Sequence, residues 1–470
     1  MNAAVLLGLY SVRTRIYAPA MQSASNFSSS PVSHVSTGPR FCPALLFCCL
    51  TLLGAFQEPL AEASDLRAGM ARVDITPSQP IKMGGYESRK DPSQGVHDPL
   101  GARVLALEAN GEHLVLVSID NLGFYNNTAE PLRQGILEAR HLKPAELLLC
   151  AIHTHSAPIL TLDPEKGGPA NVEYTKTLQA KLIEVVGVAL KNLDPVQATV
   201  CFGFSPVGVN RREVFQQGTT NSKVVLGRNP WRMTDREVQV LKLIPANGSA
   251  MLGALFAYAT HSTSLGPKNY LISGDVHGIT EQFLEHYYGH DFVAPGFAGA
   301  SGNIDPWVRV LPEFRTNNGW MPEPVLLGTM LGEEIARVLE SPQTALTNNT
   351  IRSQFKTVFL PGKQPSGPQP TTNSIASINL TVAHLGEIAF VGWGGEVFNE
   401  IGLAVKKESP FRHTFILTHC NGAAGYLPTH ESYSEGGYEV ESSKFGPGAA
   451  EALADETLRM LRKLHSSGNG

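Results

Sequence analysis

The segment "ARVLALEANGEHLVLVSID", residues 102–120, contains two apolar runs on either side of an Asn-Gly pair. Asn-Gly is typical of the two-residue turn that joins antiparallel strands, because both residues tolerate the positive φ that this turn requires. The segment therefore predicts a β-hairpin. A second segment, "INLTVAHLGEIAFVGW" at 378–393, has the same form and predicts a second hairpin.

Helical periodicity appears on both sides of these hairpins. The segment that begins at residue 172 predicts an amphipathic helix, because its apolar residues recur on one face of a 3.6-residue repeat. Those residues are Leu178, Leu182, Val185 and Ala189. Three more apolar residues recur every fourth position from Val397 and predict a helix whose first turn contains Glu396. A last helix is expected near 449–464.

Strands that alternate with amphipathic helices predict a mixed α/β fold, with a β-sheet core and flanking helices. The chain has 470 residues, of which 42% are hydrophobic and 17% are charged, as in a folded globular protein. Two loop-rich stretches, 208–235 and 361–376, do not resemble domain linkers, and there is no internal repeat. One domain is expected, with two sheets. The 37 basic and 42 acidic side chains form no basic patch, which argues against a nucleic-acid partner.

The N-terminal segment has the features of a secretory signal. The apolar run "FCPALLFCCLTLLGAF" at 41–56 has the length of a signal-peptide core, and "LAEA" offers a cleavage site after Ala63. We therefore divide the chain into a leader and signal peptide, 1–63, and a folded domain, 64–470. This division predicts a secreted, periplasmic or cell-surface protein. An uncleaved anchor is the alternative, and the start can be Met1 or Met21.

Three cysteines lie beyond this leader. Cys150, Cys201 and Cys420 are widely spaced, and an odd number of them does not predict a disulfide framework. They are expected to be small buried apolar residues.

The stretch "CAIHTHSAP", residues 150–158, brings two histidines to the end of an apolar strand. Because side chains alternate along a strand, His153 and His155 are expected on the same face. The pair is equally compatible with one buried core imidazole and one solvated imidazole. A second apolar strand ends at His261, and Glu396 follows a glycine-flanked strand. His261 alone could be a capping residue, and Glu396 alone could be a partner of the helix dipole. Two imidazoles, a carboxylate and an open position are nevertheless the ligand set of catalytic zinc sites.

Eight segments, in order along residues 66–464, resemble the catalytic region of the neutral, non-lysosomal ceramidases. These segments are "RVDITPSQPIKMGGY", "GVHDPLGARVLAL", "AIHTHSAP", "GVNRRE", "ATHSTSLGPKNYLISGD", "GNIDP", "GGEVFNEIGL" and "NGAAGYLPTHESYSEGGYEVES". The family consists of secreted zinc amidases that hydrolyse the N-acyl bond of ceramide, a sphingolipid. The resemblance covers the catalytic part and not the family's C-terminal immunoglobulin-like domain.

The resemblance implies a role for each matching residue. His153, His261, Glu396 and Tyr426 match the zinc ligands, although Ala423 stands where the family often has another tyrosine. His155 matches the histidine that assists the chemistry. Arg211 matches an arginine near the substrate. Tyr433 and Tyr438 are candidate oxyanion donors, or aromatic residues that pack at a loop.

One position departs from the family. The family's nucleophilic serine lies in a "GDVSP"-like turn, and this chain has Asp305 at that place. A carboxylate is a poor nucleophile for an amide carbonyl but a good ligand or base, so we expect an attack by zinc-activated water. Asp305 or His155 would accept the proton of this water. Arg211 and a tyrosine would stabilise the oxyanion.

Two other functions remain compatible with the sequence. Loss of the serine is also what an inactive zinc-containing binding protein on the same fold would show. A hydrolase of phosphate or sulfate esters also fits a histidine-rich zinc pocket. A second metal cluster for such chemistry would have to come from Asp98, Asp120 and Asp275, which otherwise serve as strand-end caps. The expected substrate is a small N-acyl or lipid-like molecule, and the sequence shows no membrane-binding helix beyond the leader.

Overall fold

The computed structural model describes residues 66–218, 222–248, 250–289, 291–308, 323–341, 345–364 and 374–466. These ranges belong to one compact unit. The predicted leader and signal peptide, 1–63, lie outside the described residues. No helix in the described ranges has both the length and the apolar character needed to cross a membrane.

Two mixed sheets form the centre of this unit. The larger sheet has eight strands in the order β13-β11-β10-β6-β1-β3-β4-β5, and the smaller has four in the order β15-β16-β17-β19. The strands of the larger sheet are β1 (Arg67–Asp74), β3 (Gly101–Ala109), β4 (Glu112–Ile119), β5 (Leu147–Ala151), β6 (Asp194–Phe204), β10 (Glu237–Pro245), β11 (Gly253–Tyr258) and β13 (Gly296–Ala298). Those of the smaller sheet are β15 (Ile351–Pro361), β16 (Ile375–Leu385), β17 (Ile388–Trp393) and β19 (His413–Leu417). Four short strand pairs join loops at the edges: β2 (Gly95–Val96) with β12 (Leu271–Ile272), β7 (Gly208–Asn210) with β14 (Ile304–Pro306), β8 (Arg212–Phe215) with β9 (Lys223–Leu226), and β18 (Glu396–Val397) with β20 (Tyr426–Leu427).

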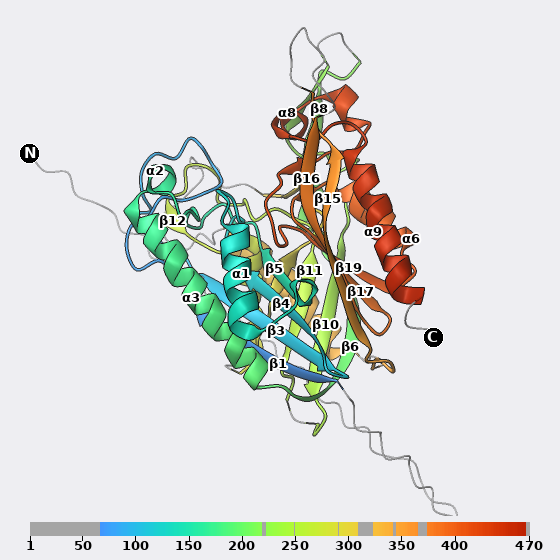
Figure 1. The fold of residues 1–470 in the computed structure, drawn as a ribbon. Helices are drawn as coiled ribbons and strands as arrows, with labels where there is room; N and C mark the ends of the chain where they lie inside the picture. Colours follow the sequence, from blue (N-terminus) through green and yellow to red (C-terminus); the bar gives the residue numbers. More distant parts are fainter. Residues whose placement is uncertain are drawn as a thin grey trace, which may run out of the picture. The chain divides into compact units, whose positions relative to one another are not determined.

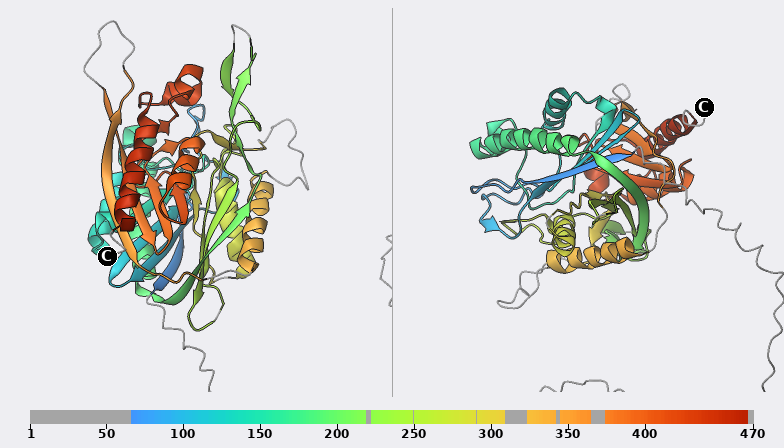
Figure 2. Two further views of the ribbon diagram at one scale, coloured as in Figure 1. Left: turned by 90° about the vertical axis from the view of Figure 1, so that its right-hand side faces the viewer. Right: turned by 90° about the horizontal axis from the view of Figure 1, so that it is seen from below.

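The helices cover the outer faces of both sheets, which gives a four-layered arrangement (Figures 1 and 2). The described helices are α1 (Ala129–Arg140), α2 (Pro164–Gly167), α3 (Pro169–Lys191), α4 (Asp275–Tyr288), α5 (Glu323–Glu340), α6 (Asn399–Glu408), α7 (Ser432–Glu435), α8 (Tyr438–Ser442) and α9 (Ala449–Ser466), with a short 3₁₀ turn, η1 (Pro144–Glu146). Helices α1 and α3 pack on β1, β3, β4 and β5, and α4 and α5 pack on β6, β10 and β11. The four-stranded sheet packs on the opposite face of the larger sheet, and α6 and α9 cover its outer side.

The predicted mixed α/β fold with a sheet core and flanking helices is confirmed. In the first hairpin Ala109 lies opposite Glu112, and the turn residues Asn110 and Gly111 have φ of 53° and 76°. Positive φ at both positions is what the Asn-Gly pair predicts. The second hairpin is β16–β17, in which Leu385 lies opposite Ile388.

Two local predictions are wrong. Glu396 is not in the first turn of a helix: it belongs to β18 and pairs with Tyr426 of β20, and α6 begins three residues later. The stretch 208–235, expected to be a loop, contains β7, β8 and β9. Strands of two to four residues are too short to show a period of their own. Strands β18 and β7 pair with the distant strands β20 and β14, whereas β8 and β9 pair with each other as a local hairpin.

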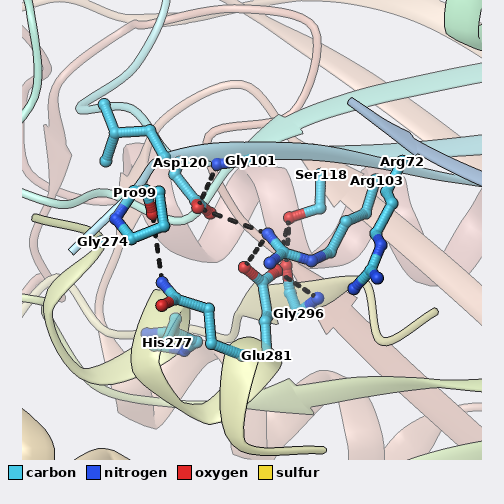
Figure 3. A network of polar contacts seen from close by, with 12 residues as sticks. Arg72, Pro99, Gly101, Arg103, Ser118, Asp120, Gly274, His277, Glu281 and Gly296 are labelled. Carbon is cyan, nitrogen blue, oxygen red and sulfur yellow. Dashed lines mark hydrogen bonds and ion pairs between the residues drawn. The ribbon is translucent and has the colours of Figure 1, made fainter. Parts of the chain in front are cut away.

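A buried arginine ties the larger sheet to α4 (Figure 3). Arg103 of β3 is 4% exposed, and its guanidinium lies 2.5 Å from Glu281, 2.7 Å from Glu285 and 3.3 Å from Asp120. The Ser118 hydroxyl contacts Glu281 as well. Buried charges are tolerated only when they are paired, so this network holds α4 against β3 and β4. These elements flank the loops described below.

We expect Arg103→Met to reduce the free energy of unfolding by about 3–5 kcal/mol, because it leaves buried carboxylates without a cation. The matched control is Arg72→Met. Arg72 also contacts Glu285, at 2.5 Å, but its side chain is 35% exposed, so we expect a loss of about 1 kcal/mol or less. Urea unfolding of the two variants measures the difference. Equal losses in the two variants would show that burial of the network adds nothing to the free energy of unfolding.

Candidate metal centre

His153 and His155 meet, but not through strand alternation. Strand β5 ends at Ala151, and His153 has a φ of 62°, in the left-handed region that a non-glycine residue seldom adopts. After this turn the Nε2 atoms of His153 and His155 lie 3.1 Å apart, with their rings nearly perpendicular. The sequence therefore predicted the juxtaposition correctly and its cause wrongly.

His261 comes to the same place from the end of β11. Its Nδ1 lies 2.9 Å from the carbonyl oxygen of Ile304, and Nδ1 of His153 lies 2.7 Å from that of Leu122. A carbonyl oxygen only accepts hydrogen bonds, so both Nδ1 atoms must carry the proton. Each Nε2 is then unprotonated, which is the state of a metal-binding imidazole. In this structure Nε2 of His261 faces Nη1 of Arg211, and Nε2 of His153 faces Nε2 of His155.

Glu396 completes the cluster. Its Oε2 lies 3.4 Å from Nε2 of His153 and 3.5 Å from Nε2 of His261. Oε2 is buried and accepts no hydrogen bond from the described residues, whereas Oε1 accepts one from the Tyr125 hydroxyl at 2.7 Å. A cation between these three electron-pair donors would stabilise their close approach in a buried place. The residues present therefore fit a metal ion.

Two imidazoles of the cluster are shifted toward the neutral form and the carboxylate toward the ionised form. Burial alone would raise the pKa of Glu396, but His153 and His261, when protonated, outweigh burial and hold this pKa well below its ordinary value. Burial and the Arg211 charge lower the pKa of His261, and burial and His153 lower that of His155 well below the usual range. An ionised carboxylate and neutral imidazoles are the forms that bind metal.

His155 and Tyr426 lie at the edge of this cluster. In the described part of the chain, the possible ligand atoms of His153, His155 and His261 all lie within 4.8 Å of one another, so His155 is close enough to be a third imidazole ligand. The Tyr426 hydroxyl accepts a hydrogen bond from Nη2 of Arg211 at 3.1 Å. The structure thus brings together all four residues that the resemblance implies as ligands, and His155 with them.

Arg211 lies next to the cluster, and Asp305 lies next to Arg211. Nη1 of Arg211 is 3.2 Å from Nε2 of His261, and the same atom lies 3.1 Å from Oδ1 of Asp305. The other oxygen of Asp305 accepts from Arg228 at 3.2 Å. Both residues are buried, and neither lines the cavity described below. Asp305 is therefore a charge partner of two arginines in this structure.

Of the two candidate oxyanion donors, one lies at the site. Tyr438 lines the cavity, with its ring centroid 5.7 Å from that of Tyr426. Tyr433 does not line it: its hydroxyl donates to the carbonyl oxygen of Phe445 at 2.7 Å. This is the packing role at a loop that the sequence left open for Tyr433.

The aspartates considered for a second metal cluster have other partners. Asp98 accepts from the backbone N–H of Gly274 and Asp120 from that of Gly101. Asp275 accepts from Val276 at 2.8 Å at the start of α4. These are caps of strand and helix ends, the structural alternative for all three residues.

Two residues of the site were not identified from the sequence. Tyr125, which orients Glu396, lies in the loop after β4 and matches no motif. His419 follows β19, and its ring is stacked on that of His153, with centroids 3.9 Å apart. Both ring nitrogens of His419 are buried without a hydrogen-bond partner among the described residues. The apolar run that ends at His419 repeats the strand-then-histidine form of His153 and His261, and this was the one available clue.

A cavity of about 460 Å³ opens onto the cluster. His153, His155, Glu396 and Tyr426 lie among its lining residues. Much of the remaining wall is apolar or aromatic: Met83, Tyr86, Leu122, Pro158, Ile159 and Leu160. The cavity therefore combines a few polar groups with an apolar wall, as small-molecule sites do.

Known proteins resemble this chain in sequence and in fold. Residues 66–308 match the family model of the neutral/alkaline non-lysosomal ceramidase, N-terminal region. The neutral ceramidase of Pseudomonas aeruginosa is 28% identical over 290 residues, which are 57% of this chain and 41% of that protein. The neutral ceramidase of Oryza sativa subsp. japonica is 27% identical over 241 residues, which are 48% and 29% of the two chains. The matched region is thus less than half the length of these relatives.

The fold is shared with a solved structure. The crystal structure of the Pseudomonas aeruginosa neutral ceramidase superposes with a TM-score of 0.71 at 19% identity, over 86% of this chain and 75% of that one. A second structure, a ceramidase complexed with C2, gives a TM-score of 0.70 at 18% identity. The family match covers more than half of the sequence and includes the segments that carry His153, His155, Arg211 and His261. This chain belongs to the neutral/alkaline non-lysosomal ceramidase family.

Proposed function

We propose that this chain is a secreted zinc-dependent hydrolase that cleaves the amide bond of N-acylated, ceramide-like lipids. The observation that carries this proposal is the meeting of two imidazole Nε2 atoms with the unpaired Oε2 of Glu396 at the cavity. The relatives named neutral ceramidase support the substrate class.

His153, His261 and Glu396, with Tyr426, would hold the metal. Two imidazoles, a carboxylate and an open position favour zinc over calcium or magnesium, which prefer oxygen ligands. Bound Zn²⁺ would polarise the substrate carbonyl and lower the pKa of a water ligand. Tyr125 holds Oε1 of Glu396 and so turns Oε2 toward the two histidines.

His155 is the proton acceptor in this proposal. It lines the cavity, and its Nδ1 is buried without a hydrogen-bond partner among the described residues. It can therefore take a proton from the attacking water and return it to the leaving amine. Asp305 is less suited to this role, because both of its oxygens accept from arginines.

Arg211 acts through its neighbours. Its guanidinium donates to the Tyr426 hydroxyl and contacts Nε2 of His261, so it lies beside two of the proposed ligand atoms and positions them. Tyr438 lines the cavity and is the tyrosine that we assign to the developing oxyanion. The apolar wall formed by Leu122, Ile159 and their neighbours would hold the acyl chain.

A substrate panel tests the function. The purified full chain is given an N-acyl sphingoid base, a carboxylic ester and a phosphate monoester with the same apolar chain. We expect hydrolysis of the amide, its loss on treatment with a chelator, and its return when Zn²⁺ is added back. Turnover of the phosphate ester alone would contradict the amidase assignment. Metal binding with no turnover of any substrate would indicate the inactive binding protein.

We expect Asp305→Ala to lower kcat more than tenfold, because Arg211 loses a buried charge partner and no longer fixes Tyr426 and His261. The control is Asp235→Ala, which removes a carboxylate paired with Lys406 at 2.6 Å. Steady-state kinetics of both variants, with circular dichroism to check folding, gives the comparison. Near-full activity of Asp305→Ala would remove Asp305 from the account.

A further inference from the structure

Cys150 and Cys420 lie opposite each other although 269 residues separate them in the chain. Cys150 is in β5, the edge strand of the larger sheet, and Cys420 follows β19 of the smaller sheet. The two residues form an isolated antiparallel bridge, and both are buried, at 1% and 0% exposure. They also belong to the same core cluster, between the two sheets, whereas Cys201 belongs to a different one.

The backbone hydrogen bonds define the type of this pair. Ala151 N–H donates to the carbonyl oxygen of His419 at 3.3 Å, and Asn421 N–H donates to that of Leu149 at 2.7 Å. These bonds flank the cysteines, so the cysteines form a non-hydrogen-bonded antiparallel pair. In such pairs the Cα atoms are about 4.5 Å apart and the side chains lie close together. This separation is within the range of about 4.4–6.8 Å that a disulfide spans.

Both cysteines are free thiols in this structure, and their side chains contact each other. Burial and a hydrogen bond with the Cys420 thiol raise the pKa of the Cys150 thiol well above its ordinary value. A Cβ on Gly392 of β17 would lie 2.5 Å from Sγ of Cys420. A side chain at position 392 would therefore collide with the Cys420 sulfur.

We propose that Cys150 and Cys420 form a disulfide when the chain folds in an oxidising compartment. The two thiols lose two protons and two electrons as the S–S bond forms. The electrons reduce one low-molecular-weight disulfide, such as oxidised glutathione, to two thiols by exchange through a mixed disulfide. Because both thiols are buried in the finished fold, this exchange takes place before the two sheets have fully packed together.

This bond would join the two sheets beside the candidate metal centre. His153 is three residues after Cys150, and His419, whose ring stacks on that of His153, directly precedes Cys420. The bond closes a loop of about 270 residues, and loops of this length gain most from a cross-link in the chain-entropy model. The proposal does not depend on the proposed hydrolase function.

Peptide mapping tests the proposal directly. The full chain is produced in an oxidising expression compartment, denatured in the presence of an alkylating agent, digested and analysed by mass spectrometry. We expect one linked pair of peptides that contains Cys150 and Cys420, that separates on reduction, and an alkylated Cys201. Alkylation of Cys150 and Cys420 as free thiols, or a link from either of them to Cys201, would overturn the proposal.

Thermal unfolding provides a second measurement. Chain that is unfolded and refolded in the presence of a thiol reductant should melt about 3–6 °C lower than chain refolded without it, and the double variant Cys150→Ala/Cys420→Ala should show no such shift. Cys201→Ala is the control and should respond to reduction as the original chain does. If the original chain and the double variant respond equally, the proposal is wrong. If the double variant fails to fold, the peptide map of the original chain still decides.

Discussion

Replacing Glu396 with Gln is expected to lower kcat/KM at least about 100-fold and to remove most of the bound zinc. The amide keeps the shape of the side chain, and its oxygen can still accept from Tyr125. The glutamine side chain lacks the negative charge that in Glu396 lies 3.4 Å from His153 and 3.5 Å from His261. The loss should therefore appear in both metal content and rate, while the melting temperature of the metal-free protein changes little.

The control for this variant is Glu400→Gln. Glu400 lies four residues further on, in α6, and accepts a hydrogen bond from Asn303 at 2.8 Å instead of facing the histidines. The Glu400→Gln protein should retain zinc and most of the activity. Equal behaviour of the two variants, or a Glu396→Gln protein with normal zinc content, would show that Glu396 is not a ligand.

The second large effect is expected from His155→Ala. A general base contributes roughly 10²–10⁴-fold to a rate, so kcat should fall by this factor. Zinc content should stay near its original value, because the proposed ligands are other residues. This combination distinguishes a proton acceptor from a third imidazole ligand, a role that the distances around His155 also permit.

Exposed His430 provides the comparison for this variant, since it does not line the cavity. His430→Ala should leave both kcat and zinc content unchanged. If His155→Ala loses zinc together with activity, His155 is a ligand, and the proton must be accepted by another group.

The sequence predicted the elements whose signals are local. The Asn-Gly turn between β3 and β4 needs positive φ at two adjacent residues, and few other pairs permit it. Helix α3 is long enough for its apolar stripe to be recognised. The histidines at the ends of β5 and β11 could be identified because each follows a continuous apolar strand.

The remainder of the site depends on contacts that no local pattern records. Glu396 reaches the histidines because β18 pairs with β20, 30 residues further along the chain. Tyr125 and His419 acquire their roles only when the two sheets pack together. Asp305 was predicted as a base or ligand from its chemistry alone, but arginines 94 and 77 residues earlier in the chain bind both of its oxygens.

The measurement that tests the central claim most directly is the metal content of the purified full chain, determined by elemental analysis beside that of Glu396→Gln. We expect about one zinc ion per chain in the original protein and far less in the variant. The chelated protein should regain both zinc and amide hydrolysis when Zn²⁺ is added. A well-folded protein that contains no zinc and does not take it up would contradict the account.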